Sequence, residues 1–116
     1  MVNLKNMGVE LAEATEPLEG QTYEIVKTEE VKTAVQGYNG IRVVMKNTNK
    51  SDETEYATML WTRERAGVNS KLGAFIAAFK DFFGDEDDAY ETNNWVGHTI
   101  RFISWQPRKR EIRVIS

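Results

Sequence analysis

Basic side chains are concentrated near the C-terminus of this chain, where they could bind an anionic partner. The last sixteen residues, from Arg101, contain five basic residues and a single acid, Glu111, whereas residues 1–30 contain two lysines against seven glutamates. Residues 85–91 add five acidic side chains to a chain of net charge −3. Such asymmetry is typical of a protein with a charged ligand, although ordinary solvated surfaces would produce the same composition.

Catalytic and metal-binding chemistry has few candidates. His98 is the only histidine, and no motif marks a nucleophile that it could activate. The chain has no cysteine, and the acidic run Asp85–Glu91 lacks the glycine and the glutamate that an EF-hand loop needs at its sixth and twelfth positions. The sequence therefore predicts a protein that is not an enzyme, that uses no metal or cofactor, and in which residues 85–94 form a solvated loop.

One helix is predicted over residues 70–84. Its apolar residues recur at i, i+3, i+4, i+7 and i+11, a stripe made by Leu72, Phe75, Ile76, Phe79 and Phe83. Ser70 is a suitable N-cap, and Gly84 suits the left-handed position that ends a helix. This stripe has to pack against the flanking strands.

Five strands are predicted around this helix, over residues 21–35, 41–46, 55–62, 99–105 and 110–115. The first loses its alternation between Val26 and Glu30, which indicates a β-bulge. Alternation places Ile41, Val43 and Met45 on one face of the second strand and Arg42, Val44 and Lys46 on the other. In the fourth strand, alternation places Arg101, Ile103 and Trp105 outside and Ile100 and Phe102 inside; in the fifth, Ile112 and Val114 point inward.

The chain is long enough for one domain, which we expect over residues 20–116, preceded by an acidic arm over residues 1–19. Pro17 and Gly20 separate the two. The N-terminus carries acidic residues where a signal peptide needs an apolar block, and no run is apolar enough to span a membrane. We therefore expect a soluble, cytoplasmic protein.

The predicted order of elements resembles the small OB-fold domains of single-stranded nucleic-acid-binding proteins of the replication protein A type, including archaeal and viral members. The likeness covers residues 18–116. It depends on the order of the elements, with one helix between strands three and four, on the glycine-containing turn before strand two, and on the run Trp95–Ile100, which looks like the start of strand four in such domains. Five short antiparallel strands with one helix to plug an end predict a small five-stranded barrel, the layout of an OB-fold. His98 stands where these domains often carry lysine, which removes one positive charge.

The resemblance implies a binding face made by strands two and three and by the loops that follow strands one and four. Residues of this chain at those places, together with Arg101 on the outer face of strand four, are Tyr38, Arg42, Lys46, Trp61, Arg63, Arg65, Arg101, Trp105, Arg108, Lys109 and Arg110. Trp61 would instead belong to the core if Ala57 and Met59 face inward with it. Tyr38 could simply shape its turn, and Trp95 is expected to pack over the helix.

These residues predict sequence-tolerant binding of single-stranded DNA or RNA, because aromatic rings stack on bases while Arg and Lys contact phosphates. The alternative is a protein-interaction module of a replication or repair assembly that binds through the acidic arm or the acidic loop, and the net negative charge favours it. Convergence of Arg42, Lys46, Trp105 and Arg108–Arg110 on one concave face would favour nucleic acid, whereas their separation would favour a protein partner. The oligomeric state is left open.

Overall fold

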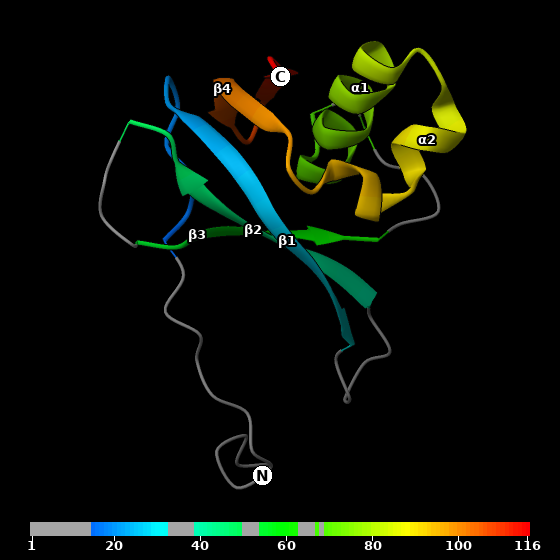
Figure 1. Ribbon diagram of the computed structural model, residues 1–116, viewed down its shortest axis with the longest axis horizontal. Coiled ribbons are helices and arrows are strands. Elements are labelled where there is room, and N and C mark those ends of the chain that lie inside the picture. The colour runs from blue at the N-terminus through cyan, green and yellow to red at the C-terminus, as the bar shows by residue number, and fades with distance from the viewer. Residues whose placement is uncertain (1–14, 33–38, 50–53, 63–66, 68) are drawn as a thin grey trace, which may run out of the picture.

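A computed structural model describes residues 15–32, 39–49, 54–62, 67 and 69–116. Its five strands are β1 (Thr22–Lys32), β2 (Asn39–Asn47), β3 (Tyr56–Trp61), β4 (Thr99–Gln106) and β5 (Lys109–Val114). The helix α1 (Lys71–Phe83) follows β3, as predicted, and the structure is mainly β (Figure 1).

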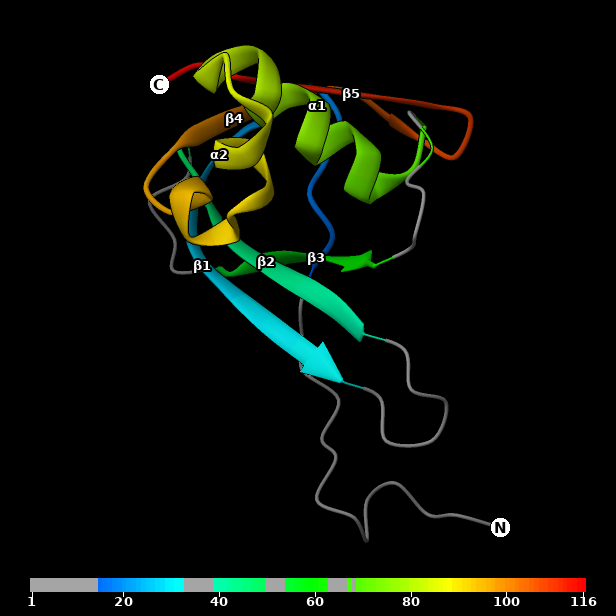
Figure 2. The same cartoon turned by 90° about the vertical axis from the view of Figure 1, so that its right-hand side faces the viewer.

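The strands form one antiparallel sheet in the order β3-β2-β1-β4-β5. Among the described residues β3 and β5 do not pair, so the predicted barrel is not closed. Instead, α1 packs against both of these edge strands (Figure 2). The aromatic stripe of α1 thus covers the apolar side of a strongly curved sheet.

The ends of α1 confirm the prediction made from its flanking residues. The Ser70 hydroxyl accepts a hydrogen bond from the amide of Gly73 at 3.0 Å, and Gly84 has a φ of 71° in the left-handed region. A side chain at Gly73 would place its Cβ 2.0 Å from the carbonyl oxygen of Gly67. A glycine is therefore required where the chain enters the helix.

The acidic run after α1 is not the predicted loop. It contains a short helix, α2 (Glu86–Tyr90), and a 3-10 helix, η2 (Thr92–Trp95). The Asp85 carboxylate accepts hydrogen bonds from the amides of Asp87 and Asp88, and the acidic residues of the first turn interact favourably with the helix dipole. Several charges that could have served a ligand therefore stabilise a local helix.

Trp95 packs at the centre of the core, as predicted. Its ring stacks on Phe79 with centroids 5.1 Å apart and planes 3° apart, and it also stacks on Phe75. The indole N–H donates to the carbonyl of Ala89 at 2.9 Å, so the one polar atom of this buried ring is satisfied. Trp95 thereby joins η2, α2 and α1.

The first two strands agree with the predicted pattern. The register between β1 and β2 shifts between Ile25 and Lys27, which confirms a bulge at Val26. Val43 and Met45 are buried in the core and Ile41 packs against it, so the inward face of β2 was also predicted correctly.

The segment before β1, assigned from the sequence to the acidic arm, contacts the sheet where the structure describes it. The carbonyl of Thr15 accepts from the amide of Ala57 on β3, and Pro17 is buried. The amide of Gly20 donates to the carbonyl of Phe102 on β4 at 2.7 Å. Residues 15–20 therefore reach both β3 and β4.

Truncation of Trp95 should strongly destabilise the domain. We expect Trp95→Ala to lower the free energy of unfolding by about 3–5 kcal/mol, because it removes a fully packed ring from the aromatic cluster. Trp61→Ala is the matched control, since that ring is 43% exposed and should cost less than about 1 kcal/mol. Urea unfolding followed by circular dichroism measures both, and equal losses would contradict the packing described here.

Candidate nucleic-acid interface

The outer face of the β4–β5 hairpin carries two arginines directly opposite each other. Arg101 on β4 pairs in register with Arg113 on β5, and both side chains are exposed. None of the ion pairs within the described residues includes either guanidinium. Like charges opposite each other on neighbouring strands are destabilising. This pair therefore creates a local positive potential that an anion would relieve.

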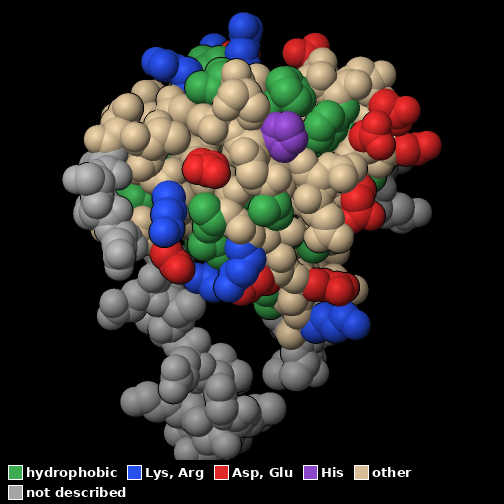
Figure 3. Space-filling model, viewed as in Figure 1, with side chains coloured by type: hydrophobic (Ala, Val, Ile, Leu, Met, Phe, Trp, Pro, Cys, Tyr) green, Lys and Arg blue, Asp and Glu red, His purple; other side chains and the backbone are tan. Residues whose placement is uncertain are grey.

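Three more basic residues lie at the end of the same hairpin. Arg108 in the turn and Lys109 at the start of β5 are exposed, while Arg110 is half-buried. In Figure 3, basic side chains project at the end of the molecule where this hairpin lies, and acidic side chains gather over α2. The basic residues of the hairpin and the acidic residues of α2 therefore lie in different parts of the molecule.

Trp105 does not share the outer face with Arg101, and this prediction was wrong. The register between β4 and β5 shifts between Phe102 and Ser104, so Ile103 is an extra residue that reverses the alternation after it. The Trp105 ring therefore turns toward the core, where its centroid lies 4.8 Å from that of Phe102.

The remaining contacts of Trp105 hold it in this inward position. The guanidinium carbon of Arg110 lies 4.9 Å from the centroid of the Trp105 ring, within range of a cation–π interaction. The bulge frees the backbone amide of Trp105, which donates to the Glu19 carboxylate at 2.9 Å. Arg110 thus lies over a ring that the sequence suggested as a platform for a base.

A second group of predicted residues lies on the outer face of β2 and β3. Trp61 is 43% exposed beside Gly40, where an added Cβ would lie 3.0 Å from the Trp61 ring. The question left open by the sequence is therefore answered: Trp61 is at the surface, while Ala57 on the same strand is buried. Trp61 is the most exposed tryptophan in the described part of the chain.

Arg42 lies near Trp61 on this face but is already engaged by an acid. Its Nη1 contacts the Glu29 carboxylate at 3.3 Å, and Lys27 contacts the same carboxylate. The hydrogen bond from Lys27 and, to a lesser extent, the Arg42 guanidinium lower the pKa of Glu29, while its slight desolvation opposes them. Glu29 therefore remains ionised at neutral pH and holds Arg42.

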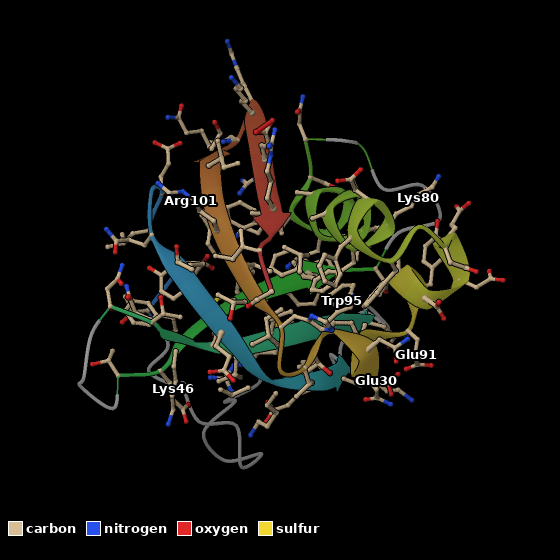
Figure 4. The ribbon with its side chains drawn as sticks, turned by 45° about the horizontal axis from the view of Figure 1, so that its top comes forward. Glu30, Lys46, Lys80, Glu91, Trp95 and Arg101 are labelled. Carbon is tan, nitrogen blue, oxygen red and sulfur yellow. The ribbon has the colours of Figure 1, made fainter. Side chains whose placement is uncertain are left out.

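The predicted residues form two groups rather than one concave face. Arg42, Lys46 and Arg101 lie on the outer face of the sheet, and Figure 4 shows Lys46 and Arg101 pointing away from the buried Trp95. Trp105 and Arg110 lie on the side that faces α1. Tyr38, Arg63 and Arg65 lie outside the described residues.

Arg113 was missed in the sequence analysis, although its position could have been read from the pattern. Ile112 and Val114 were expected inside the sheet, so Arg113 between them had to lie outside. The bulge at Ile103 leaves this part of the hairpin in register, and Arg113 pairs with Arg101.

His98 is engaged in structural contacts. The His98 ring lies against Phe79, Phe82 and Phe83, and its Nδ1 is 3.1 Å from the carbonyl oxygen of Ser116. Within the described ranges, no group of three or more His, Asp or Glu side chains is arranged to hold a metal ion.

Comparisons with family models, curated proteins and solved structures find no match to this chain. The interpretation of the site therefore depends on its geometry and charge. No helix in the described part of the chain is long and apolar enough to cross a membrane.

The corrected position of Trp105 changes the expected effect of its removal. We expect Trp105→Ala to lower the free energy of unfolding by roughly 2 kcal/mol, because the ring packs on Phe102 and Phe75. Arg108→Ala, three residues away in an exposed turn, should change it by less than about 0.5 kcal/mol. Urea titrations of both variants test this placement, which would be wrong if Trp105→Ala were as stable as Arg108→Ala.

Proposed function

We propose that this domain binds single-stranded DNA or RNA without strong sequence preference, with its phosphates on the outer face of the β4–β5 hairpin. The observation that carries this proposal is the cross-strand pair Arg101 and Arg113, which no acidic side chain among the described residues neutralises. A phosphate between the two guanidinium groups would replace repulsion by two charge-assisted hydrogen bonds. Arg108 and Lys109 extend the positive surface along the strand.

A flexible single strand suits this surface better than a rigid duplex. The basic hairpin and the exposed Trp61 belong to different parts of the sheet, and a single strand can bend to contact both. Stacking of one base on Trp61 would contribute about 1–3 kcal/mol, with little dependence on the identity of the base. Trp105 is not part of this proposal, because Arg110 and the core already contact its ring.

The architecture supports an OB-fold as part of the same proposal. An OB-fold is a five-stranded, partly open barrel, and the present sheet has five curved strands with α1 between the two unpaired edges. In such a fold the loops after the first and fourth strands flank the ligand. The turn containing Arg108 is the second of these loops.

A protein partner is the second candidate, and one specific observation favours it. Trp105 and Arg110 face α1 while Arg42 and Lys46 face outward, so these residues do not build a continuous groove for a nucleic-acid strand. The exposed acidic residues of α2 offer a separate surface for a basic partner. Nucleic-acid titration separates the candidates, since binding through α2 would not depend on Arg101 or Arg113.

Removal of either hairpin arginine should weaken binding and reduce its salt dependence. We expect Arg101→Ala and Arg113→Ala each to lower the slope of log K against log salt concentration by about 0.7, the value for one phosphate contact with a single strand. Fluorescence anisotropy of labelled oligo-dT at several salt concentrations measures this slope. Lys80→Ala on α1 removes the same charge and is the control.

Two results would count against the proposal. Oligo-dT could fail to bind below about 100 μM in low salt, where even non-specific binding is detectable. Alternatively, all three variants could lose the same slope, which would indicate a response to net charge instead of contacts with Arg101 and Arg113.

Both arginine variants should unfold at urea concentrations no lower than the wild type, because each relieves a like-charge contact.

A further inference from the structure

An open groove runs between α1 and the free edge of β5. Its volume is about 630 Å³. The α1 side presents small residues, Ala74, Ala77 and Ala78, followed by Asp81 and a half-exposed Phe82, and the other side is the strand Arg110–Val114. Figure 4 shows α1 beside β5, on the side away from β4. This groove adjoins the outer face that carries Arg101, and Arg113 belongs to both.

The backbone of β5 points hydrogen-bonding groups toward this groove. In an antiparallel strand, the N–H and C=O of one residue point to the same side, and successive residues alternate. The amide of Ile115 donates to the carbonyl of Thr99 on β4 at 2.8 Å. The backbone N–H and C=O of Arg113, two residues earlier, therefore also point toward β4. Ile112 and Val114 therefore direct their N–H and C=O groups away from β4. No described strand pairs with that edge.

We propose that this groove binds an extended segment of a partner protein, which adds to β5 as an antiparallel strand. Addition to a sheet edge satisfies the backbone groups of Ile112 and Val114, and side chains on alternate residues supply specificity. The groove of about 630 Å³ is the space for a single extended chain; of the alanines that line it, Ala77 is exposed and Ala74 and Ala78 are buried at its floor. Pairing between the β5 edges of two copies of this domain is less favourable, because the α1 of each copy packs beside its own β5.

The charges of β5 predict the sequence that this segment should have. Glu111 and Arg113 lie on the outer face of β5, and residues directly opposite them on an added strand would be their closest neighbours. The segment should therefore place an acid opposite Arg113 and a base opposite Glu111. Small apolar residues should lie opposite Ile112 and Val114, where they would face Ala74, Ala77 and Ala78.

A synthetic peptide tests this register. The peptide Thr-Val-Glu-Val-Lys-Ser-Thr places its valines opposite Val114 and Ile112, its glutamate opposite Arg113 and its lysine opposite Glu111. Titrated into the ¹⁵N-labelled full chain, it should shift the amide signals of residues 110–114 with half-saturation below about 1 mM. The peptide with Glu and Lys exchanged has the same composition and should bind at least about tenfold more weakly. The absence of a shift at about 1 mM peptide, or equal shifts with both peptides, would overturn the proposal.

N-methylation of the peptide separates strand addition from attraction between charges. A methyl group on the amide of the second valine removes a hydrogen bond to Ile112 and should abolish the shifts. A methyl group on the amide of the glutamate, which points away from β5, should change binding less than about threefold. Equal effects of the two modifications would contradict strand addition.

Variants of the protein locate the peptide in the groove. Ala77 is exposed on α1 and lines the groove, so Ala77→Trp should fill the groove and eliminate peptide binding. Lys80 lies outside the groove lining and contacts Glu86 of α2, so Lys80→Trp should leave peptide binding unchanged. The double variant Glu111→Lys with Arg113→Glu should prefer the exchanged peptide. Peptide binding that survives Ala77→Trp would overturn the proposal. The proposal would also be overturned if the chain self-associates, if Ala77→Trp removes this self-association, and if the peptide does not affect it.

The groove and the nucleic-acid surface can be tested independently. Ala77→Trp leaves Arg101 and Arg113 in place, so it should not alter the binding of oligo-dT. Arg101→Ala leaves the groove intact, so it should not alter the binding of the peptide. Failure of either ligand to bind therefore leaves the result for the other unaffected.

Discussion

The stack of Phe79 on Trp95 is the contact on which the rest of the structure depends. The two rings are nearly parallel, and Phe75, one helical turn earlier, stacks on the same indole. Phe75 also contacts Phe102 on β4. One aromatic cluster thus fixes α1 to the segment that follows it and to the centre of the sheet. Because α1 lies between the edge strands, this cluster also determines that β5 has a second edge with which none of the described strands pairs.

The position of α1 gives β5 two different surfaces. Its outer face carries Arg113 beside Arg101, and its free edge faces the groove along α1. The first surface suits phosphate groups and the second suits a polypeptide backbone. Arg113 is common to both, because its side chain lies on the outer face directly next to the edge. A partner segment with an acid at that position would compete with nucleic acid for Arg113.

Local sequence patterns predicted the parts of the fold that depend on neighbouring residues. The cap at Ser70, the left-handed Gly84 and the bulge at Val26 are all set by interactions within a few residues or between adjacent strands. Trp95 could be assigned to packing over the helix because tryptophan is highly buried on average. Closure of the barrel could not be predicted, because it depends on where α1 lies relative to two strands far apart in the sequence.

The candidate site was predicted less well, and one residue accounts for most of the difference. Ile103 is the bulged residue of β4, and no glycine or break in the apolar pattern marks it. The bulge turns Trp105 inward while leaving Arg101 outside. The acidic run after α1 was misinterpreted for a related reason: Asp85 caps α2 with its own side chain, a local effect that composition alone conceals.

Native-state hydrogen exchange tests the central claim most directly, because among the described strands β5 pairs with β4 alone. The amides of Arg113 and Ile115 face β4 and should be strongly protected, whereas those of Ile112 and Val114 face the groove and should exchange at least about tenfold faster. Such alternation along a single strand would support an unpaired edge beside α1. Equal protection of all four amides would show that β5 is paired on both sides and would contradict the account.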